Sequence, residues 1–176
     1  IVVFFAIGFE TTTPMTCALM EQVIKQDIKN ILFHINHITV PVVMEVLVQD
    51  ENCKIDAFLG PSHVSVISGS KIYEEFPLSY NKPVVVSGFE PVDVMQSISM
   101  IVKQFKEKRS DLEVEYKRLV SYEGNLKAQE LINRYFKKVP FKFRGIGEVE
   151  NSGYELKDEF DKYNAKIVYK EILPTQ

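Results

Sequence analysis

Two carboxylates and one imidazole stand at matching places in the sequence, just after short apolar runs. Glu10 closes the tripeptide Gly8-Phe9-Glu10, and Glu90 closes the same tripeptide at residues 88–90. His63 follows a third apolar run in the segment Gly60-Pro61-Ser62-His63. Carboxylate and imidazole groups carry protons and hydrogen-bond small ligands. The three residues are therefore our candidate catalytic residues.

Each of these residues needs a strand before it and a helix after it. The threonines and proline of Thr11-Thr12-Thr13-Pro14 are typical of a helix start, and so are the residues of Pro91-Val92-Asp93. The carboxyl ends of parallel strands are where open α/β sheets bind their ligands. We therefore expect the three turns to open onto one pocket. The candidate ligand-binding residues beside them are Thr11, Thr12, Ser65 and Asp93.

A purely structural role is the alternative for each residue. Either glutamate could cap the amides of the following helix, and the ring of His63 could hydrogen-bond within its own turn. The repetition of one tripeptide favours a site over two unrelated caps. Glycine-rich phosphate-binding motifs are absent from the sequence, which counts against a nucleotide pocket.

The sequence offers no obvious metal cage. Its two cysteines, Cys17 and Cys53, are too few for a four-thiolate site, and their surroundings favour a small core residue and an ordinary loop thiol. His34 and His37 lack an obvious third ligand, so we interpret them as strand-end residues. We predict no metal ligands in this chain.

Apolar runs of strand length alternate with segments of helical period, which predicts an α/β fold: mainly parallel sheet with flanking helices in Rossmann-like βαβ units. The first half, 1–82, should hold strands near 2–7, 31–35 and 55–59. The second half, 83–176, should hold a strand after Pro83 and a helix through Phe105. One compact unit is the alternative to two halves.

Further along, the patterns predict a strand over 112–120 and a helix from Asn125 that Pro140 ends. Residues 141–176 should form a peripheral strand, a turn and a short helix. We interpret the basic residues Lys106, Lys108 and Arg109 as a solvated helix end.

Composition restricts the classes of partner. A formal charge of −3 disfavours nucleic acid and anionic membrane surfaces, and no apolar run is long enough to span a bilayer. We therefore expect a cytoplasmic protein. The chain begins with Ile1 inside a predicted strand, so we also expect it to be a fragment of a longer protein.

Several motifs in order resemble those of the HypD family, the maturation proteins of nickel–iron hydrogenases. The resemblance spans nearly the whole chain, and Ser62 departs from the glycine expected at its position. The matching motifs are Phe4-Phe5-Ala6-Ile7-Gly8-Phe9-Glu10-Thr11-Thr12, Gly60-Pro61-Ser62-His63-Val64-Ser65, Gly88-Phe89-Glu90-Pro91-Val92-Asp93, Arg144-Gly145-Ile146-Gly147 and Ser152-Gly153.

The resemblance implies a scaffold on which the iron of the hydrogenase site receives cyanide and carbon monoxide, forming the Fe(CN)2CO unit. It implies two partners, a HypC-like chaperone and a HypE-like cyanide donor. It also implies iron and an iron–sulfur cluster in the full-length protein. The family's cysteine motifs do not match Cys17 or Cys53, so we expect them before Ile1 and beyond Gln176.

On this interpretation the chain alone is inactive, and the sequence leaves open whether the whole protein is an enzyme or a scaffold. The candidate residues would then line a cleft, orient the iron ligands and supply protons during cyanide transfer. The alternatives are an α/β module that binds a small molecule or anion and a docking platform for another protein.

Overall fold

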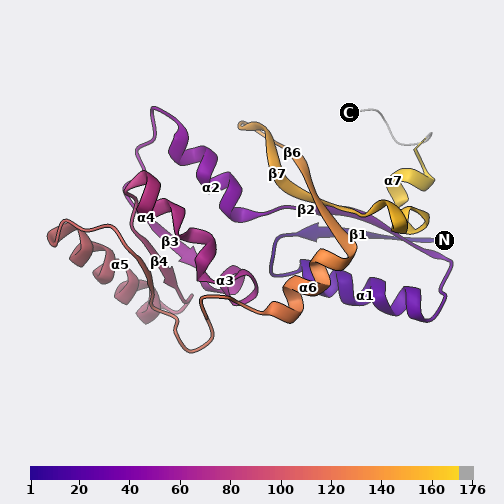
Figure 1. Cartoon of the computed structure of the whole chain (residues 1–176), viewed down its shortest axis with the longest axis horizontal. Helices are drawn as coiled ribbons and strands as arrows, with labels where there is room; N and C mark the ends of the chain where they lie inside the picture. The colour runs from indigo at the N-terminus through magenta and orange to yellow at the C-terminus, as the bar shows by residue number, and fades with distance from the viewer. Residues whose placement is uncertain (171–176) are drawn as a thin grey trace. The chain divides into compact units, whose positions relative to one another are not determined.

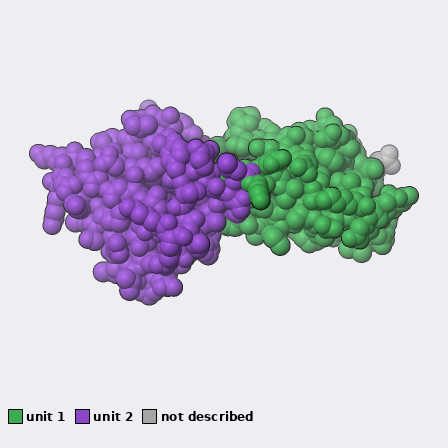
Figure 2. Space-filling view, turned by 60° about the horizontal axis from the view of Figure 1, so that its bottom comes forward, with its two compact units in different colours: residues 1–42, 127–176 green, residues 43–126 purple. Residues whose placement is uncertain are grey.

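Parallel sheets flanked by helices make up most of the structure, which confirms the predicted α/β fold (Figure 1). The computed structural model describes residues 1–170. Two compact units divide the chain: unit 1 comprises residues 1–42 and the chain from residue 127 onward, and unit 2 comprises residues 43–126 (Figure 2).

This division differs from the predicted halves, 1–82 and 83–176. The boundary between those halves falls inside unit 2, between β3 (Phe58–Pro61) and β4 (Val84–Ser87). These two strands pair in parallel, so they belong to one sheet. Unit 1 instead joins segments that lie far apart in the sequence.

The first predicted βαβ unit lies in unit 1. β1 (Val2–Gly8) and β2 (Ile31–His37) pair in parallel, and α1 (Thr13–Lys25) connects them. Thr16 of α1 hydrogen-bonds His37 of β2, with 2.9 Å between Oγ1 and Nε2. Cys17 is fully buried in α1, as expected of a small core residue. α1 therefore packs on the sheet through the face that carries Thr16 and Cys17.

An antiparallel hairpin completes unit 1. β6 (Phe136–Phe143) pairs with β7 (Gly147–Leu156), and the backbone amide of Thr39 donates to the carbonyl of Ser152 in β7. The other elements from residue 126 onward are α6 (Leu126–Tyr135, whose first residue belongs to unit 2), the 3-10 helix η2 (Asp158–Tyr163) and α7 (Ala165–Val168). The predicted strand, turn and short helix are present, and residues 171–176 of that prediction lie outside the described residues.

The prediction that Pro140 ends a helix is wrong. α6 ends at Tyr135 and the chain passes directly into β6, which contains Pro140. The pairing of β6 with β7 shifts register between Val139 and Phe141. Because proline has no amide hydrogen, it fits a strand at such an irregularity.

Unit 2 holds a three-stranded parallel sheet in the order β3-β4-β5, with β5 at Leu112–Val114. Its core contains Tyr73, Phe76, Val84, Val86 and Val120. The helices of this unit are α2 (Val40–Gln49, which begins in unit 1), α3 (Ser62–Ser68), the 3-10 helix η1 (Ser70–Tyr73), α4 (Glu75–Tyr80) and α5 (Pro91–Lys106).

The strand predicted over 112–120 is shorter than expected. After Val114, the amides of Glu115 and Tyr116 both donate to the carbonyl of Val86, and the amide of Lys117 donates to Glu115. These hydrogen bonds turn the chain away from the sheet. None of the helices within residues 1–170 combines the length and apolar character needed to cross a membrane.

Candidate functional site

Glu10 lies in the turn between β1 and α1, where the chain approaches itself closely. Gly8 has a φ of 144°, and a Cβ at this position would lie 2.0 Å from Oγ1 of Thr12. Only glycine leaves room for the threonine there. The turn is closed by hydrogen bonds from Thr12 and Thr13 to the carbonyl of Phe9.

The carboxylate of Glu10 is buried and caps another helix rather than its own. Its Oε1 accepts a hydrogen bond of 3.0 Å from the amide of Val40, the first residue of α2. Its Oε2 is buried and has no hydrogen-bond partner among the described residues. Burial raises the pKa of Glu10, although the amide of Val40 and the charge of Lys138 act in the opposite direction.

Tyr154 on β7 shares this environment. Burial, with contributions from Glu10 and Cys17, raises the pKa of Tyr154 to about 12. Tyr154 also lines a cavity of about 650 Å³ in unit 1, together with His34 and Asn36 of β2. The cavity carries charges of both signs, including Lys166 and Glu155, and therefore favours no single charge of ligand.

Replacing Glu10 with glutamine should change how stability depends on pH. Because the folded state raises the pKa of Glu10, it holds this proton at a pH where the unfolded chain has released it. The free energy of unfolding therefore falls as pH rises from the ordinary glutamate range through the raised pKa. Glu10→Gln removes this fall, so the free energy of unfolding of the variant should rise relative to that of the unmodified protein as the pH increases.

Urea unfolding of both proteins between pH 4 and 8 measures this difference. Glutamine keeps an acceptor for the amide of Val40. The pH-dependent part of the difference in unfolding free energy therefore reports the proton on Glu10. A difference that stays constant across this range would contradict the assignment.

His63 and Glu90 lie in unit 2, and the structure brings their two turns together. The ring of His63, at the start of α3, lies 4.6 Å from the ring of Phe89 between centroids. Phe89 comes directly before Glu90, and all three side chains are exposed. An imidazole, an exposed aromatic ring and a carboxylate thus occur together at the carboxyl ends of β3 and β4.

The neighbouring polar residues in this region differ in whether they have hydrogen-bond partners within the protein. Ser65 is buried and donates to the carbonyl of Pro61 at 2.9 Å, so it stabilises the first turn of α3. Ser62 is fully buried, and its Oγ has no partner among the described residues. Glu90 precedes α5 as its N-cap residue, but its side chain makes no capping hydrogen bond.

Asp93 is buried against Arg118. Nη2 of Arg118 lies 3.0 Å from the nearer carboxylate oxygen, and the guanidinium lies 4.2 Å above the ring of Tyr116. A Cβ on Gly88 would lie 2.0 Å from the same carboxylate. A hydrogen bond with Tyr116 and then the charges of Asp93 and Glu90 raise the pKa of Arg118. Asp93 therefore holds the turn through its ion pair with Arg118.

Replacing Arg118 with alanine should destabilise the protein by about 1–2 kcal/mol, because the buried carboxylate of Asp93 loses its charged partner. Arg134→Ala is the matched control, since it removes ion pairs to Glu21 and Glu130 in which Arg134 and Glu130 are largely exposed. It should cost less than about 1 kcal/mol. Urea unfolding compares the two variants, and equal losses would contradict the role given to Arg118.

The structure thus joins His63 with the turn of Glu90. Glu10 belongs to unit 1, and the expectation that all three side chains open onto one pocket stays a prediction, as do the ligand-binding roles of Thr11, Thr12, Ser65 and Asp93. Sequence reasoning missed Arg118 and Tyr154. Arg118 lies in no recognisable motif, whereas Tyr154 follows the Ser152-Gly153 motif and could have been considered.

The cysteines of this chain do not fit an iron–sulfur cluster. Cys17 is buried, which raises its thiol pKa to about 12, so it stays protonated at neutral pH. Cys53 is half-buried in unit 2. Within residues 1–170 no three His, Cys, Asp or Glu side chains are grouped so that they could hold a metal ion. His37 instead bonds Thr16, and burial lowers its pKa.

The fold and the turns define an α/β protein whose chemistry-bearing side chains follow the carboxyl ends of parallel strands. The family model named HypD and described as the hydrogenase formation hypA family matches residues 1–176. The chain therefore belongs to the HypD family.

Curated relatives agree with this assignment. The chain is 42% identical over 173 residues to hydrogenase maturation factor HypD2 of Bradyrhizobium diazoefficiens, covering 94% of this chain and 46% of the relative. It is 39% identical over 171 residues to hydrogenase maturation factor HypD of Azotobacter vinelandii, covering 94% and 45%. It is 38% identical over 171 residues to hydrogenase maturation factor HypD of Escherichia coli strain K12, covering 96% and 46%. The chain thus spans a little less than half the length of these relatives.

Proposed function

We propose that this chain serves in a hydrogenase maturation factor and that its strand-end turns act where iron receives its cyanide and carbon monoxide ligands. The names of the relatives support a role in hydrogenase maturation. The observation that carries the assignment to the turns is the buried carboxyl group of Glu10, with one bonded oxygen and one that lacks a partner among the described residues.

Glu10 is suited to hold and release a proton. Burial raises the pKa of Glu10 and so favours its protonated form, while the hydrogen bond from the amide of Val40 fixes the orientation of the carboxyl group. In the proposed role, Glu10 gives up or accepts the proton that accompanies cyanide transfer. Thr11 and Thr12 in the same turn are proposed to hydrogen-bond the incoming ligands.

His63 and Glu90 are proposed to orient the ligands. The Phe89 ring beside His63 restricts the orientation of the imidazole, whose nitrogens can hydrogen-bond a cyanide nitrogen. Glu90 is exposed and makes no capping bond with α5, so its carboxylate is available to hydrogen-bond a ligand. Asp93 and Ser65 hold the two turns in place.

Iron is the cargo of this reaction, and the soft ligands and electrons that it requires are not supplied by residues 1–170. We propose that a thiol that holds the iron and an iron–sulfur cluster belong to parts of the full-length protein outside this chain. The proposed partners are a HypC-like chaperone and a HypE-like cyanide donor, and the proposed location is the cytoplasm.

A graft tests this proposal. In the graft, this chain replaces the matching segment of the Escherichia coli relative, to which it is 38% identical. The graft is then expressed in cells that lack their own copy of that factor. We expect the graft to restore hydrogenase activity. A graft that is folded by thermal unfolding, yet restores no activity while the unmodified relative does, would show that the proposal is wrong.

A further inference from the structure

The cavity of about 650 Å³ in unit 1, which we call the unit 1 cavity, is large enough for a small molecule. One side of it is apolar, because Val139, Pro140 and Phe141 follow one another on β6. The ring of Phe141 also contacts that of Phe143, with 5.2 Å between the centroids. The cavity therefore offers an apolar surface that includes an aromatic ring.

The Ser152-Gly153 motif holds this side of the cavity in place. A Cβ on Gly153 would lie 3.0 Å from the Cβ of Phe141, so the missing side chain leaves room for the phenylalanine. Ser152 is fully buried, and its hydroxyl donates to the carbonyl of Val149 at 2.6 Å. The carbonyl of Ser152 accepts a hydrogen bond from the amide of Thr39, two residues after β2. The motif thus fixes the hairpin of β6 and β7 beside the end of β2.

The other side of the cavity is polar and carries three uncharged groups. His34 and Asn36 alternate on β2, so their side chains leave the same face of the strand. Tyr154 of β7 is the third group. Within residues 1–170, the side chains of Asn36 and Tyr154 make no hydrogen bond with another residue. Burial, together with the charge of Lys166, lowers the pKa of His34, so its imidazole is neutral at pH 7.

The charged side chains that line the cavity balance one another. Lys166 lies 3.5 Å from Glu155, measured from Nζ to Oε1. Lys142 and Glu148 are register partners on β6 and β7, and side chains in such positions lie on the same face of a sheet within reach of each other. The cavity as a whole therefore attracts neither a cation nor an anion.

Two further lysines lie near the lining without being part of it. Lys137 pairs with Asp158 on the side of the hairpin that is exposed to solvent, and the charge of Lys138 acts on the buried carboxyl group of Glu10. Both positive charges therefore have acidic neighbours within unit 1. The groups that remain for a ligand are the uncharged ones.

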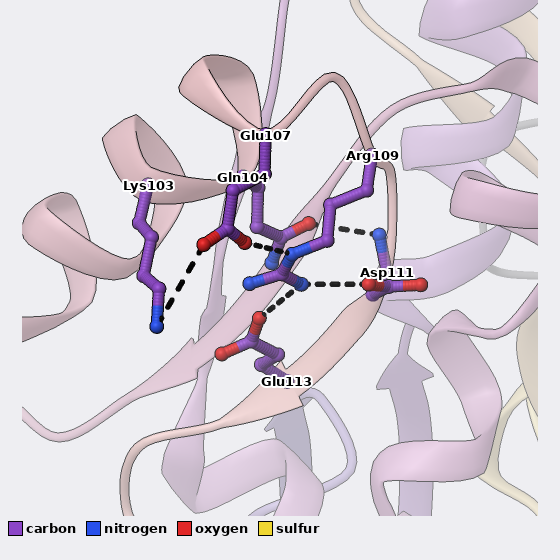
Figure 3. Close-up of polar contacts among 6 residues, drawn as sticks. All are labelled: Lys103, Gln104, Glu107, Arg109, Asp111 and Glu113. Atoms are coloured by element: carbon purple, nitrogen blue, oxygen red, sulfur yellow. Dashed lines mark hydrogen bonds and ion pairs between the residues drawn. The ribbon is translucent and has the colours of Figure 1, made fainter.

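A charged cluster in unit 2 differs from this cavity, because its groups are paired with one another (Figure 3). At the carboxyl end of α5, Arg109 contacts the carboxylates of Glu107, Asp111 and Glu113 at 2.5–2.7 Å, and these bonds raise its pKa. Lys103 lies 3.9 Å from Glu107. The basic residues near this end are therefore not one solvated group, because Arg109 is engaged within the fold.

We propose that the unit 1 cavity binds an uncharged, planar molecule that carries a carboxamide group. A carboxamide presents N–H donors beside a carbonyl acceptor, and the side chain of Asn36 presents the same pair. The two amides can therefore exchange two hydrogen bonds, while Tyr154 and His34 bond the donor and acceptor that remain. The ring of the ligand packs against Pro140 and Phe141. A charged ligand would lose its hydration without gaining a free partner of opposite charge.

Three probes of nearly equal shape but different charge test the proposal. Benzamide is uncharged, benzoate is an anion and benzamidine is a cation at neutral pH. Each is titrated into the 176-residue chain while NMR follows the backbone amide signals of β2, β6 and β7. For a molecule of this size we expect benzamide to bind with a dissociation constant of about 1–10 mM. Benzoate and benzamidine should bind at least about fivefold more weakly.

Asn36→Asp should reverse this preference. The carboxylate keeps the shape of the side chain but has no N–H to donate, and it can pair with two N–H groups of benzamidine. We expect benzamide to bind the variant at least about fivefold more weakly and benzamidine about tenfold more tightly. Asn30→Asp is the matched control, because Asn30 is an exposed residue just before β2 and does not line the cavity. It should leave the dissociation constants of all three probes unchanged.

Tyr154→Phe tests the polar side independently, since it removes only a hydroxyl group. It should weaken benzamide binding about three- to tenfold. Thermal unfolding checks that each variant is folded. The proposal would be overturned if benzamide gave no saturable shifts below about 50 mM, or shifted only signals of unit 2. Equal binding of the three probes, or equal weakening of benzamide by Asn30→Asp and Asn36→Asp, would overturn it as well.

Discussion

Replacing Gly69 with alanine should lower the free energy of unfolding of unit 2 by about 3 kcal/mol or more. Gly69 follows α3 with φ 83° and ψ 162°, a conformation that is essentially restricted to glycine. A Cβ there would also lie 2.1 Å from the backbone carbonyl oxygen of Tyr122. Backbone atoms of the loop before α6 would have to move, because no flexible side chain can give way.

The contact is reciprocal, since a Cβ on Gly124 would lie 2.3 Å from the amide nitrogen of Gly69. Gly145 provides the matched control: it has a similar φ of 84°, but no atom lies within 4 Å of its Cβ position. Gly145→Ala should therefore cost only the strain of its backbone conformation, about 1–2 kcal/mol. Hydrogen exchange of amides in β3 and β4 measures the loss in unit 2, and exchange of amides in β6 and β7 measures the loss in unit 1, which contains Gly145. Equal effects of both variants would contradict the close packing of residues 69 and 124.

Glu10→Gln should reduce hydrogenase maturation by the graft about 100-fold, the scale at which a positioned proton carrier contributes to a reaction. Glutamine keeps the hydrogen bond to Val40 and the shape of the side chain but carries no exchangeable acidic proton. Folding should therefore be preserved while maturation is lost. The readout is the rate at which active hydrogenase accumulates in cells that produce equal amounts of each graft.

Arg134→Ala provides the control for this assay, because Arg134 pairs only with Glu21 and Glu130 on α1 and α6 among the contacts described here. It should mature hydrogenase at the normal rate. If Glu10→Gln also matured hydrogenase normally, the proton would have to come from another group, and Glu10 would be a structural cap of α2.

The sequence predicted the local units of the fold well. Strands that end at glycine and helices that begin at proline could be predicted, because the residues that mark each end lie within a few positions of it. β1 ends at Gly8 and α5 begins at Pro91. The turns with Glu10, His63 and Glu90 follow directly from these signals. The ring contact of His63 with Phe89 joins two of the turns.

The parts that could not be predicted depend on contacts between distant residues. The helical period of α5 was evident, but periodicity does not say which face is covered. The buried residues of α5 are polar, and Asp93 and Gln104 among them bond to Arg118 and to the amide of Asp111. Pro140 was interpreted as a helix stop because its place beside β7 is set by pairing with residues further along the chain. Unit 1 likewise joins residues 1–42 with the chain beyond residue 126, which no local pattern could indicate.

The central claim is that three turns, far apart in sequence, serve one maturation reaction. The most direct measurement is hydrogenase maturation by the graft carrying Glu10→Gln, His63→Ala and Glu90→Gln together, compared with the single variants. When residues act as a unit, the loss of activity in a combined variant is much smaller than the sum of the losses in the single variants. We therefore predict that the triple variant is folded, matures almost no hydrogenase and is hardly worse than Glu10→Gln alone. Maturation by the folded triple variant at the rate of the unmodified graft would contradict the claim.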